Sequence, residues 1–468
     1  MSTLLGKTIR TISGTEYLLT EIVGQGAQGI VYKESSGEHL IKMYFNTNEI
    51  HARKQIDKIK WLSKQNYPDR FIMPIDIIEK PYVGYVMKRV KGHFSLNKLL
   101  IPSKGLSFSD WYNDFSGGLR RRLYLGFQIA QAFNILHKDN RAYCDISGNN
   151  VLVVEDKAKA SVCMIDIDNL YIPGTDKTSI LGTARYMAPE ILNKQMQPDI
   201  FTDDFSLAVL IFELLKVGHP YVGDVISDGT PEMESDAYKG DYPYVDDEDN
   251  TFNRSNKMLP SEVVINPKLR ELFKKTFLDG KMNRMSRATA FELSVACLEA
   301  SNVLIKCKEC NSWFFPTKKV DSKFTCPWCD KENDTPCYLS FRDSYKRYDK
   351  NTAKKEVKQK VISSYLLRES VNSITDNYVF RSKSEIEVKE CFRIAFGTDG
   401  KYYLLNPAGN EMFYKKHNLT GRAIQIGSVE KQALNRGDMI YFGDPSVFEN
   451  EEDSPISKMK VLRYAIIM

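Results

Sequence analysis

Three oxygen-bearing side chains fall within one stretch of the chain, from Tyr143 to Asp168. Asp145 and Asn150 lie five residues apart in a polar loop, and Asp166 ends the second of two short apolar runs that follow. Two strands flanking the loop would bring these side chains to one place. Transfer of a phosphoryl group from a magnesium-bound nucleotide needs such a place, with an aspartate to orient a hydroxyl and an asparagine and an aspartate to bind metal.

A glycine-rich turn near the N-terminus points to the same chemistry. Gly24, Gly26 and Gly29 have the spacing G-x-G-x-x-G, which lets backbone N–H groups approach phosphate oxygens. In a dinucleotide-binding fold this spacing opens a helix. Here the run 30–32 continues as a strand of β-branched and aromatic residues, which predicts a hairpin that folds over a ligand. A purely structural glycine hairpin is the simpler alternative for this turn taken alone.

A lysine lies in the next apolar strand. Lys42 falls within the run 40–44, where burying a charged side chain is unfavourable unless it is paired. A phosphate is one partner, and a side chain that reaches the surface is the alternative. Residues 48–64 have helical spacing of apolar residues. Glu49 or Asp57 on this helix could pair with the lysine, and the sequence does not choose between them.

The elements that must position these residues follow from hydrophobic periodicity. Residues 207–215 carry apolar residues at i, i+3, i+4, i+7 and i+8, which predicts a buried core helix that Asp203 or Asp204 could cap. Residues 224–262, rich in glycine, proline and acids, predict an exposed loop insertion. The other expected elements are three strands over 17–45, a strand over 82–90, and helices over 119–137 and 267–305.

Together these residues resemble the protein kinase family over roughly residues 15–302. The family's order is kept from the glycine-rich turn with Val31, through Lys42, Asp145 to Asn150, Asp166, Ala188-Pro189-Glu190 and Asp203, to Arg287. The resemblance implies a bilobal α+β fold, with an N-lobe over 1–90 and a C-lobe over 91–302. It also implies a serine/threonine protein kinase that uses ATP and Mg²⁺ on protein substrates.

The family's roles transfer position by position. Asp145 would be the catalytic base, and Asn150 and Asp166 would hold Mg²⁺. Glu190 would form a structural ion pair with Arg287. Asp203 would brace the catalytic loop, and His137 is expected to pack or hydrogen-bond there. The implied ATP-binding residues are Gly24, Gly26, Gly29, Val31, Lys42, Met87 in the adenine pocket, and Lys88 and Val90 in the hinge.

The sequence departs from the family's pattern near the catalytic loop. Cys144 stands where the family has arginine, and Ser147 where serine/threonine kinases have lysine. Asp-Phe-Gly becomes Asp166-Ile167-Asp168. Asp168 could also reach a metal or be the aligned aspartate, but Asp166 is favoured because the apolar run 162–165 leads directly into it.

The lysine, base and metal ligands remain, so activity is favoured over a catalytically inactive scaffold. The segment from Gly182 to Glu190 resembles the peptide-positioning segment of protein kinases, which favours a protein over a small-molecule substrate. Thr178, Ser179 and Thr183 are the expected autophosphorylation sites.

Four of the nine cysteines form two Cys-x-x-Cys pairs, which are Cys307 with Cys310 and Cys326 with Cys329. Four thiolates at this spacing fit tetrahedral Zn²⁺ and predict a zinc ribbon over 303–340. Cys337 is the less favoured ligand. A metal site together with an odd number of cysteines indicates a reducing, cytoplasmic location.

The rest of the chain is expected to be a charged linker over 341–370 and a β-sandwich or barrel over 371–468. Residues 434–443 resemble part of a forkhead-associated domain, but the Ser-x-x-His motif of its phosphate site is not found. The strands expected are 392–396, 402–405, 412–414, 423–426, 439–442 and 460–467. The whole arrangement is similar to kinases of tellurium-resistance-type phosphorylation clusters, which implies a phosphatase and a von Willebrand-type protein as partners.

Composition limits the number of domains and the classes of partner. The 468 residues are 42% hydrophobic and 27% charged with a net charge of +5, which predicts several soluble domains and gives no signal for nucleic acid or membrane partners. The N-terminus lacks the apolar core of a secretory signal, and no apolar run approaches the length of a membrane span.

Overall fold

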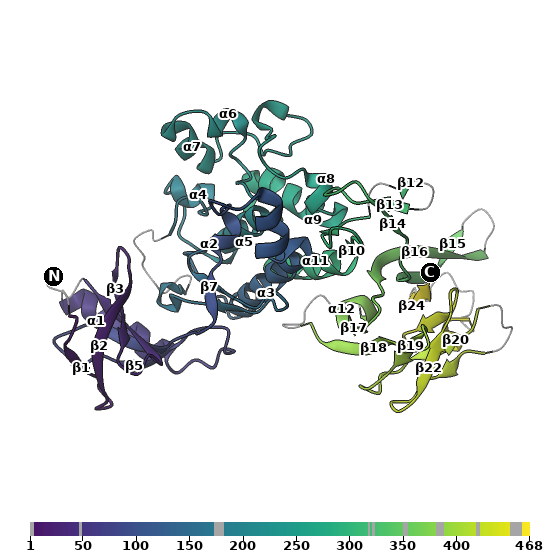
Figure 1. Cartoon of the computed structure of the whole chain (residues 1–468), viewed down its shortest axis with the longest axis horizontal. Helices are drawn as coiled ribbons and strands as arrows, with labels where there is room; N and C mark the ends of the chain where they lie inside the picture. Colours follow the sequence, from purple (N-terminus) through teal and green to yellow (C-terminus); the bar gives the residue numbers. More distant parts are fainter. Residues whose placement is uncertain are drawn as a thin grey trace. The chain divides into compact units, whose positions relative to one another are not determined.

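The computed structural model describes residues 4–45, 49–172, 182–316, 319–320, 323–349, 354–380, 388–417, 422–449 and 461–468. The chain forms two compact units. The first unit comprises Met1–Gly117, Gln128–Leu259 and Glu271–Ala290, and the second comprises Gly118–Phe127, Pro260–Arg270 and Phe291–Met468. Figure 1 labels their elements in sequence order.

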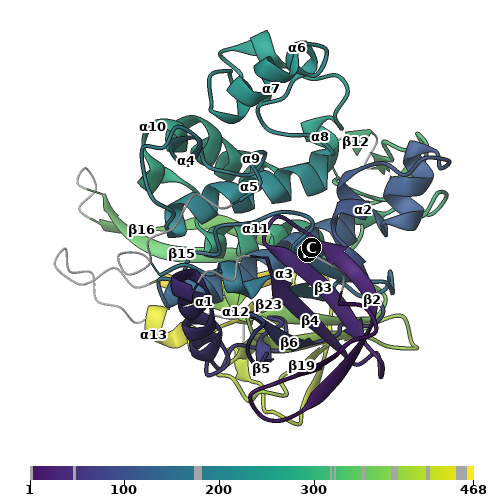
Figure 2. The same ribbon diagram turned by 90° about the vertical axis from the view of Figure 1, so that its left-hand side faces the viewer.

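The first unit begins with a six-stranded antiparallel sheet. Apolar side chains of its strands form two buried clusters, and one of these includes residues of helix α1 (Glu49–Leu62). Figure 2 shows α1 beside the sheet, and this helix was expected over 48–64. The strand order is β1 (Thr8–Arg10), β2 (Glu16–Gln25), β3 (Gly29–Glu34), β4 (His39–Tyr44), β6 (Gly84–Lys88) and β5 (Pro74–Ile77).

A small sheet holds the polar loop that carries the candidate catalytic residues. Strand β8 (Val151–Val154) pairs with β7 (His93–Ser95) on one side and β9 (Val162–Met164) on the other, all antiparallel. The apolar runs after Asn150 and before Asp166 thus become neighbouring strands. Their pairing brings Asn150, just before β8, close to Asp166, just after β9.

The buried helix is α5 (Ile200–Lys216), as its apolar spacing predicts. Its cap differs from the expectation. Asp199, rather than Asp203 or Asp204, accepts hydrogen bonds from the backbone N–H groups of Phe201 and Thr202. The two later aspartates are inside the helix, where Asp203 contacts the catalytic loop and Asp204 contacts His137 and the backbone N–H of Ala290.

Residues 224–262 are not a simple exposed loop. They contain α6 (Asp224–Ser227), α7 (Pro231–Tyr238) and η3 (Thr251–Asn253), and Tyr244 and Val245 are buried among them. The expectation of an exposed loop was wrong because the glycines, prolines and acids punctuate and cap short helices. The remaining helical elements before the tail are α2 (Asn97–Leu100), η1 (Asp110–Phe115), α3 (Gly118–Lys138), η2 (Ile167–Asn169), α4 (Pro189–Leu192), α8 (Ser261–Val264), α9 (Pro267–Lys274), η4 (Lys275–Asp279), α10 (Gly280–Met282), η5 (Arg284–Ser286) and α11 (Ala290–Asn302).

The tail of the second unit is rich in strands. A six-stranded and a four-stranded sheet enclose one apolar core that includes Phe341, Phe392 and Ile440. The six-stranded order is β16 (Lys354–Leu366), β15 (Tyr338–Asp349), β24 (Val461–Ile467), β23 (Met439–Tyr441), β20 (Phe413–Lys415) and β21 (Ile424–Gln425). The four-stranded order is β17 (Val371–Thr375), β18 (Glu390–Phe396), β19 (Tyr402–Leu405) and β22 (Lys431–Leu434), and short helices α12 (Asp376–Val379) and α13 (Pro445–Glu449) complete the tail.

The charged segment 341–370 is not a linker. It contains most of β15 and all of β16, which pair with each other, and β15 also pairs with β24. Leu339 and Phe341 are buried on β15, and Asp343 continues the buried side by pairing with Arg463 at 2.7 Å. The prediction failed because this buried ion pair interrupts the apolar alternation that marks a strand.

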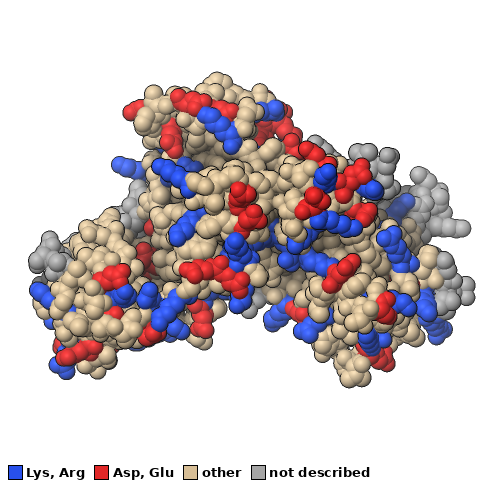
Figure 3. All heavy atoms as spheres, viewed as in Figure 1, with Lys and Arg blue, Asp and Glu red and all other residues tan. Residues whose placement is uncertain are grey.

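Lysine and arginine side chains are interspersed with aspartate and glutamate over the visible described surface (Figure 3). Among the helices that the structure describes, none combines the length and apolar character needed to cross a membrane.

Candidate active site

The glycine-rich turn joins β2 to β3 and is anchored to the strand that carries Lys42. A Cβ atom on Gly29 would lie 2.1 Å from the carbonyl oxygen of Met43, so a larger residue cannot pair there without moving the backbone. An added Cβ on Gly24 or Gly26 would meet nothing within 4 Å. One glycine therefore fixes the hairpin, and the other two leave open space along its backbone, as a phosphate-binding turn requires.

The residues expected around the adenine ring belong to one apolar cluster. Met87 is buried in it, and Val31, Val90 and Ile165 pack against it from the turn, the hinge and the end of β9. Lys88 has an exposed side chain, so its backbone is the part available to a ligand. The structure thus brings the expected apolar lining together.

Asp203 holds the start of the catalytic loop. Its carboxylate accepts hydrogen bonds from the backbone N–H groups of Tyr143 at 2.5 Å and Cys144 at 3.1 Å. Cys144 has a positive φ of 69°, an unfavourable conformation that these bonds stabilise. The imidazole of His137 lies 3.4 Å from both Asp203 and Asp204. Burial opposes its charge, but the two carboxylates raise the pKa of His137 to about 9.

Asp145 and Asn150 are in direct contact. The Asn150 side-chain amide donates to the Asp145 carboxylate and to the Asp145 backbone carbonyl, each at 2.9 Å. The other carboxylate oxygen of Asp145 accepts from the backbone N–H of Thr183 at 3.1 Å and from its hydroxyl at 3.2 Å. An aliphatic hydroxyl of the chain itself therefore occupies the position from which a base could remove a proton. Thr178 and Ser179 lie outside the described residues.

Asp166 lies next to Asn150. The backbone N–H of Ile165 donates to the Asn150 carbonyl at 3.0 Å, and Asp166 follows with a positive φ of 56°. Burial raises the pKa of the Asp166 carboxyl, and the neighbouring charge of Asp168 adds to this effect. A divalent cation would favour the ionised form. The carboxylate of Asp166 and the amide oxygen of Asn150 are hard ligands suited to Mg²⁺.

Lys42 on strand β4 contacts the segment that follows strand β9. Its ammonium group lies 3.2 Å from Asp166 and 2.9 Å from Asp168. Burial opposes the charge, but the two carboxylates outweigh it and raise the pKa of Lys42. Lys42, Asp145, Asn150 and Asp166 are therefore linked through short contacts, as their order in the sequence predicts.

The strong pairing of Lys42 with Asp168 was not anticipated. From the sequence, Asp168 is expected only as a second metal ligand or as the aligned aspartate. Asp57 on α1 is exposed, and the side chain of Glu49 lies outside the described residues. A second contact that was not anticipated joins the glycine-rich turn to the segment after Asp166, where the Gln28 amide donates to Asn169 at 3.2 Å.

Glu190 and Arg287 form the expected ion pair. Two guanidinium nitrogens donate to the two carboxylate oxygens at 2.7 and 2.9 Å, and the Arg287 side chain is 1% exposed. Such a bidentate pair fixes α4 against the region before α11.

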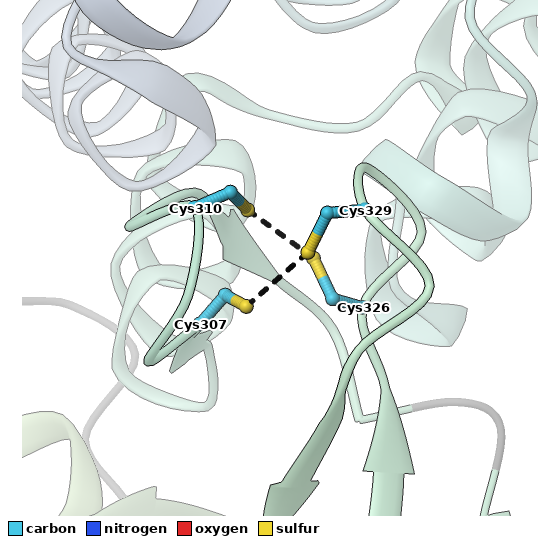
Figure 4. Close-up of side chains that lie close together, drawn as sticks. All are labelled: Cys307, Cys310, Cys326 and Cys329. Atoms are coloured by element: carbon cyan, nitrogen blue, oxygen red, sulfur yellow. Dashed lines mark hydrogen bonds between the residues drawn. The ribbon is translucent and has the colours of Figure 1, made fainter.

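The four paired cysteines gather in the second unit. Cys307 and Cys310 follow β10 (Ile305–Lys306), and Cys326 and Cys329 follow β13 (Lys323–Thr325). All four sulfur atoms lie within 4.8 Å of one another (Figure 4). The Asn333 amide donates to the Cys307 sulfur at 3.5 Å, which suits a thiolate bound to metal. The donor set and its spacing fit a tetrahedral Zn²⁺ ion.

Comparison with known proteins agrees with this geometry. The family described as protein kinase domain matches residues 17–295, more than half of the chain. Serine/threonine-protein kinase dkf-2 of Caenorhabditis briggsae is 25% identical over 213 residues, which cover 44% of this chain and 17% of the relative. The probable serine/threonine-protein kinase CPE1738 of Clostridium perfringens is 26% identical over 230 residues, covering 46% and 31%.

Serine/threonine-protein kinase Nek11 of Homo sapiens is 22% identical over 337 residues, covering 65% of this chain and 47% of the relative. The chain thus spans less than half the length of each of these relatives. The region that matches the protein kinase family, residues 17–295, contains the glycine-rich turn, Lys42, the catalytic loop and the Glu190–Arg287 pair. The chain belongs to the protein kinase family.

Proposed function

We propose that this chain is a serine/threonine protein kinase that transfers the γ-phosphoryl group of ATP to hydroxyl groups of protein substrates. The observation that carries the proposal is the chain of contacts among Lys42, Asp166, Asn150 and Asp145 in one compact unit. The names of the relatives support the same reaction.

In this proposal each residue has one task. The backbone of the glycine-rich turn and the Lys42 ammonium bind the phosphates, and Asn150 and Asp166 hold Mg²⁺, which offsets charge on the phosphates. Asp145 orients the attacking hydroxyl and accepts its proton. The Thr183 contact supports an aliphatic hydroxyl as the acceptor, because Asp145 already receives such a donor at 3.2 Å.

The test is turnover of Mg-ATP by the full chain, with mass spectrometry of the enzyme and of co-purified proteins. Asp145→Asn and Lys42→Met should each reduce phosphoryl transfer by at least about 100-fold, because each removes a group that acts on the reacting phosphate or hydroxyl. The matched control is Asp57→Asn, an exposed carboxylate on α1, which should retain wild-type turnover.

Two other results would overturn the proposal. Equal background turnover in wild type and both variants would indicate a catalytically inactive scaffold. A labelled metabolite with no labelled protein would indicate a small-molecule kinase. Phosphate on Thr183 in active enzyme, absent in Asp145→Asn, would identify this hydroxyl as a substrate.

The tail has proposed roles of its own. The cysteine cluster would bind Zn²⁺ as a structural ribbon, and the strand-rich domain, forkhead-associated-like at 434–443, would recruit partners or regulate the kinase. A metal-dependent phosphatase and a von Willebrand-type protein are the partners that the arrangement suggests, in a cytoplasmic setting. Co-purification with the tail deleted and intact tests these roles.

A further inference from the structure

Asp168 is a buried carboxylate with every acceptor position occupied. Its side chain is 2% exposed. One oxygen accepts from the Lys42 ammonium at 3.0 Å and from the Tyr85 hydroxyl at 3.0 Å. The other accepts from Lys42 at 2.9 Å and from the Tyr44 hydroxyl at 2.5 Å. All of these donors belong to the adjacent strands β4 and β6.

This arrangement distinguishes Asp168 from Asp166, two residues earlier. Asp166 accepts one hydrogen bond from Lys42, at 3.2 Å, and its side chain is 31% exposed. A carboxylate offers about four lone-pair directions, and Asp168 already uses four. Asp166 therefore has acceptor capacity for a cation, whereas Asp168 has its capacity filled by protein donors.

The described ion partners of Lys42 are Asp166 and Asp168, and neither lies on helix α1. Asp57, the acid of α1 whose side chain the structure describes, is exposed. The more buried of the two acids that hold Lys42 thus comes from the turn η2 after β9.

We propose that Asp168 is the positioning residue for Lys42. Asp168 and the proposed metal ligand Asp166 are on one short turn, so the lysine and the metal ligand are set by the same piece of backbone. Two tyrosine hydroxyls fix the carboxylate from the sheet. The lysine is then held ready for nucleotide by a buried carboxylate that follows β9. This inference rests on the proposed binding of nucleotide by Lys42.

The test measures nucleotide affinity rather than turnover. The Kd of a fluorescent ADP analogue is determined for the full chain in EDTA and in saturating Mg²⁺. Asp168→Asn keeps the shape of the side chain but removes its charge, and should raise the Kd at least about tenfold in both conditions, because Lys42 loses its partner. Asp166→Asn is the comparison variant. It removes a proposed metal ligand and the longer of the two Lys42 contacts, so it should raise the Kd more in Mg²⁺ than in EDTA.

A second variant keeps the carboxylate and removes one of the groups that hold it. If Asp168→Asn does not fold, Tyr85→Phe removes one of the fixing hydroxyls and should raise the Kd severalfold with and without Mg²⁺.

Two results would overturn the inference. One is an unchanged Kd of Asp168→Asn in EDTA. The other is a loss of affinity confined to Mg²⁺, which would make Asp168 a metal ligand. The wild type could bind nucleotide with a Kd that Lys42→Met raises, yet transfer no phosphate. In that case the proposed reaction is wrong, while the role of Asp168 still holds.

Discussion

Buried charges in the first unit occur as ion pairs with close geometry. Arg287 pairs with Glu190 at 2.7 Å, and Lys216 pairs with Asp246 at 2.7 Å. Removing both members of such a pair can leave stability nearly unchanged, because desolvation offsets much of the attraction. Removing one member leaves a charge without its partner in a poorly hydrated place, which strongly destabilises the fold.

Arg287→Ala is therefore expected to lower the free energy of unfolding by about 3–5 kcal/mol. Glu190, whose side chain is 13% exposed, would lose both of its guanidinium donors. Chemical denaturation of the full chain, followed by circular dichroism, measures the change. The control is Lys257→Ala, because Lys257 and its partner Asp228 are 55% and 68% exposed, and its loss should change stability by less than about 1 kcal/mol. Equal effects of the two variants would contradict the argument.

The order of residues in the chain was enough to predict the Glu190–Arg287 pair, the bracing by Asp203 and the position of His137. It was not enough to assign Asp168. The hydroxyls that fix this carboxylate come from Tyr44 and Tyr85, far away in sequence, and only the register of β4 with β6 brings them together. A pattern of types and spacings carries no information about which of two nearby aspartates becomes buried.

At the scale of elements, apolar alternation predicted most of the strands of the tail, including Tyr402–Leu405 with its observed bounds. The longest strands were missed. β16 is an edge strand, and Lys358 and Lys360 are among its exposed residues. Lysines on an edge strand protect it from pairing with other chains, but they are also typical of a solvated linker. A high density of charged residues therefore indicates that a segment is exposed, but it does not show that the segment lacks a strand.

The cysteine ribbon is an element with few apolar contacts of its own. Its buried cluster includes Cys307, Phe314, Cys326 and Leu366. Because so short a segment buries little apolar surface, bound metal is expected to supply much of its stability. The wild-type chain should carry about one Zn²⁺, and a strong chelator should remove it and increase hydrogen exchange from β10 to β14 (Glu332–Asp334).

The matched variants separate a metal ligand from any other cysteine. Cys326→Ser should abolish stoichiometric zinc, measured by elemental analysis. Cys337→Ser, outside the four-sulfur cluster, should retain the metal. Zinc retained by the first variant, or hydrogen exchange that does not respond to chelation, would refute a structural metal site.

At the scale of the whole molecule, the second unit combines most of helix α11 with the strand-rich tail. Polar side chains join them: Asn302 donates to the Tyr378 hydroxyl at 3.2 Å, and Arg368 donates to the Ser301 carbonyl at 3.1 Å. The last helix of the kinase match thus shares a compact unit with residues that lie far later in the chain. Single polar residues on a helix do not reveal partners that lie so far along the chain. The sequence alone therefore predicted a domain boundary after residue 302.

Glu299 makes this packing sensitive to pH. Burial raises the pKa of its carboxyl to about 7, although the Asn377 amide, which donates to it at 3.0 Å, favours the ionised form. The folded chain thus holds this proton more tightly than the unfolded chain, whose glutamates titrate near their ordinary value. The stability contributed by the protonated group is complete below about pH 4.3 and is lost as the pH rises through 7, a change of about 4 kcal/mol.

Hydrogen exchange of α11 and α12 between pH 5 and 8, corrected for the intrinsic pH dependence of exchange, tests this effect. Protection in the wild type should fall with rising pH relative to Glu299→Gln, because the amide keeps the shape of the side chain and cannot ionise. Glu262→Gln, an exposed glutamate on α8 of the same unit, should follow the wild type. If wild type and Glu299→Gln lose protection in parallel, the carboxyl of Glu299 titrates at its ordinary pH, and the packing of α11 against the tail does not depend on its proton.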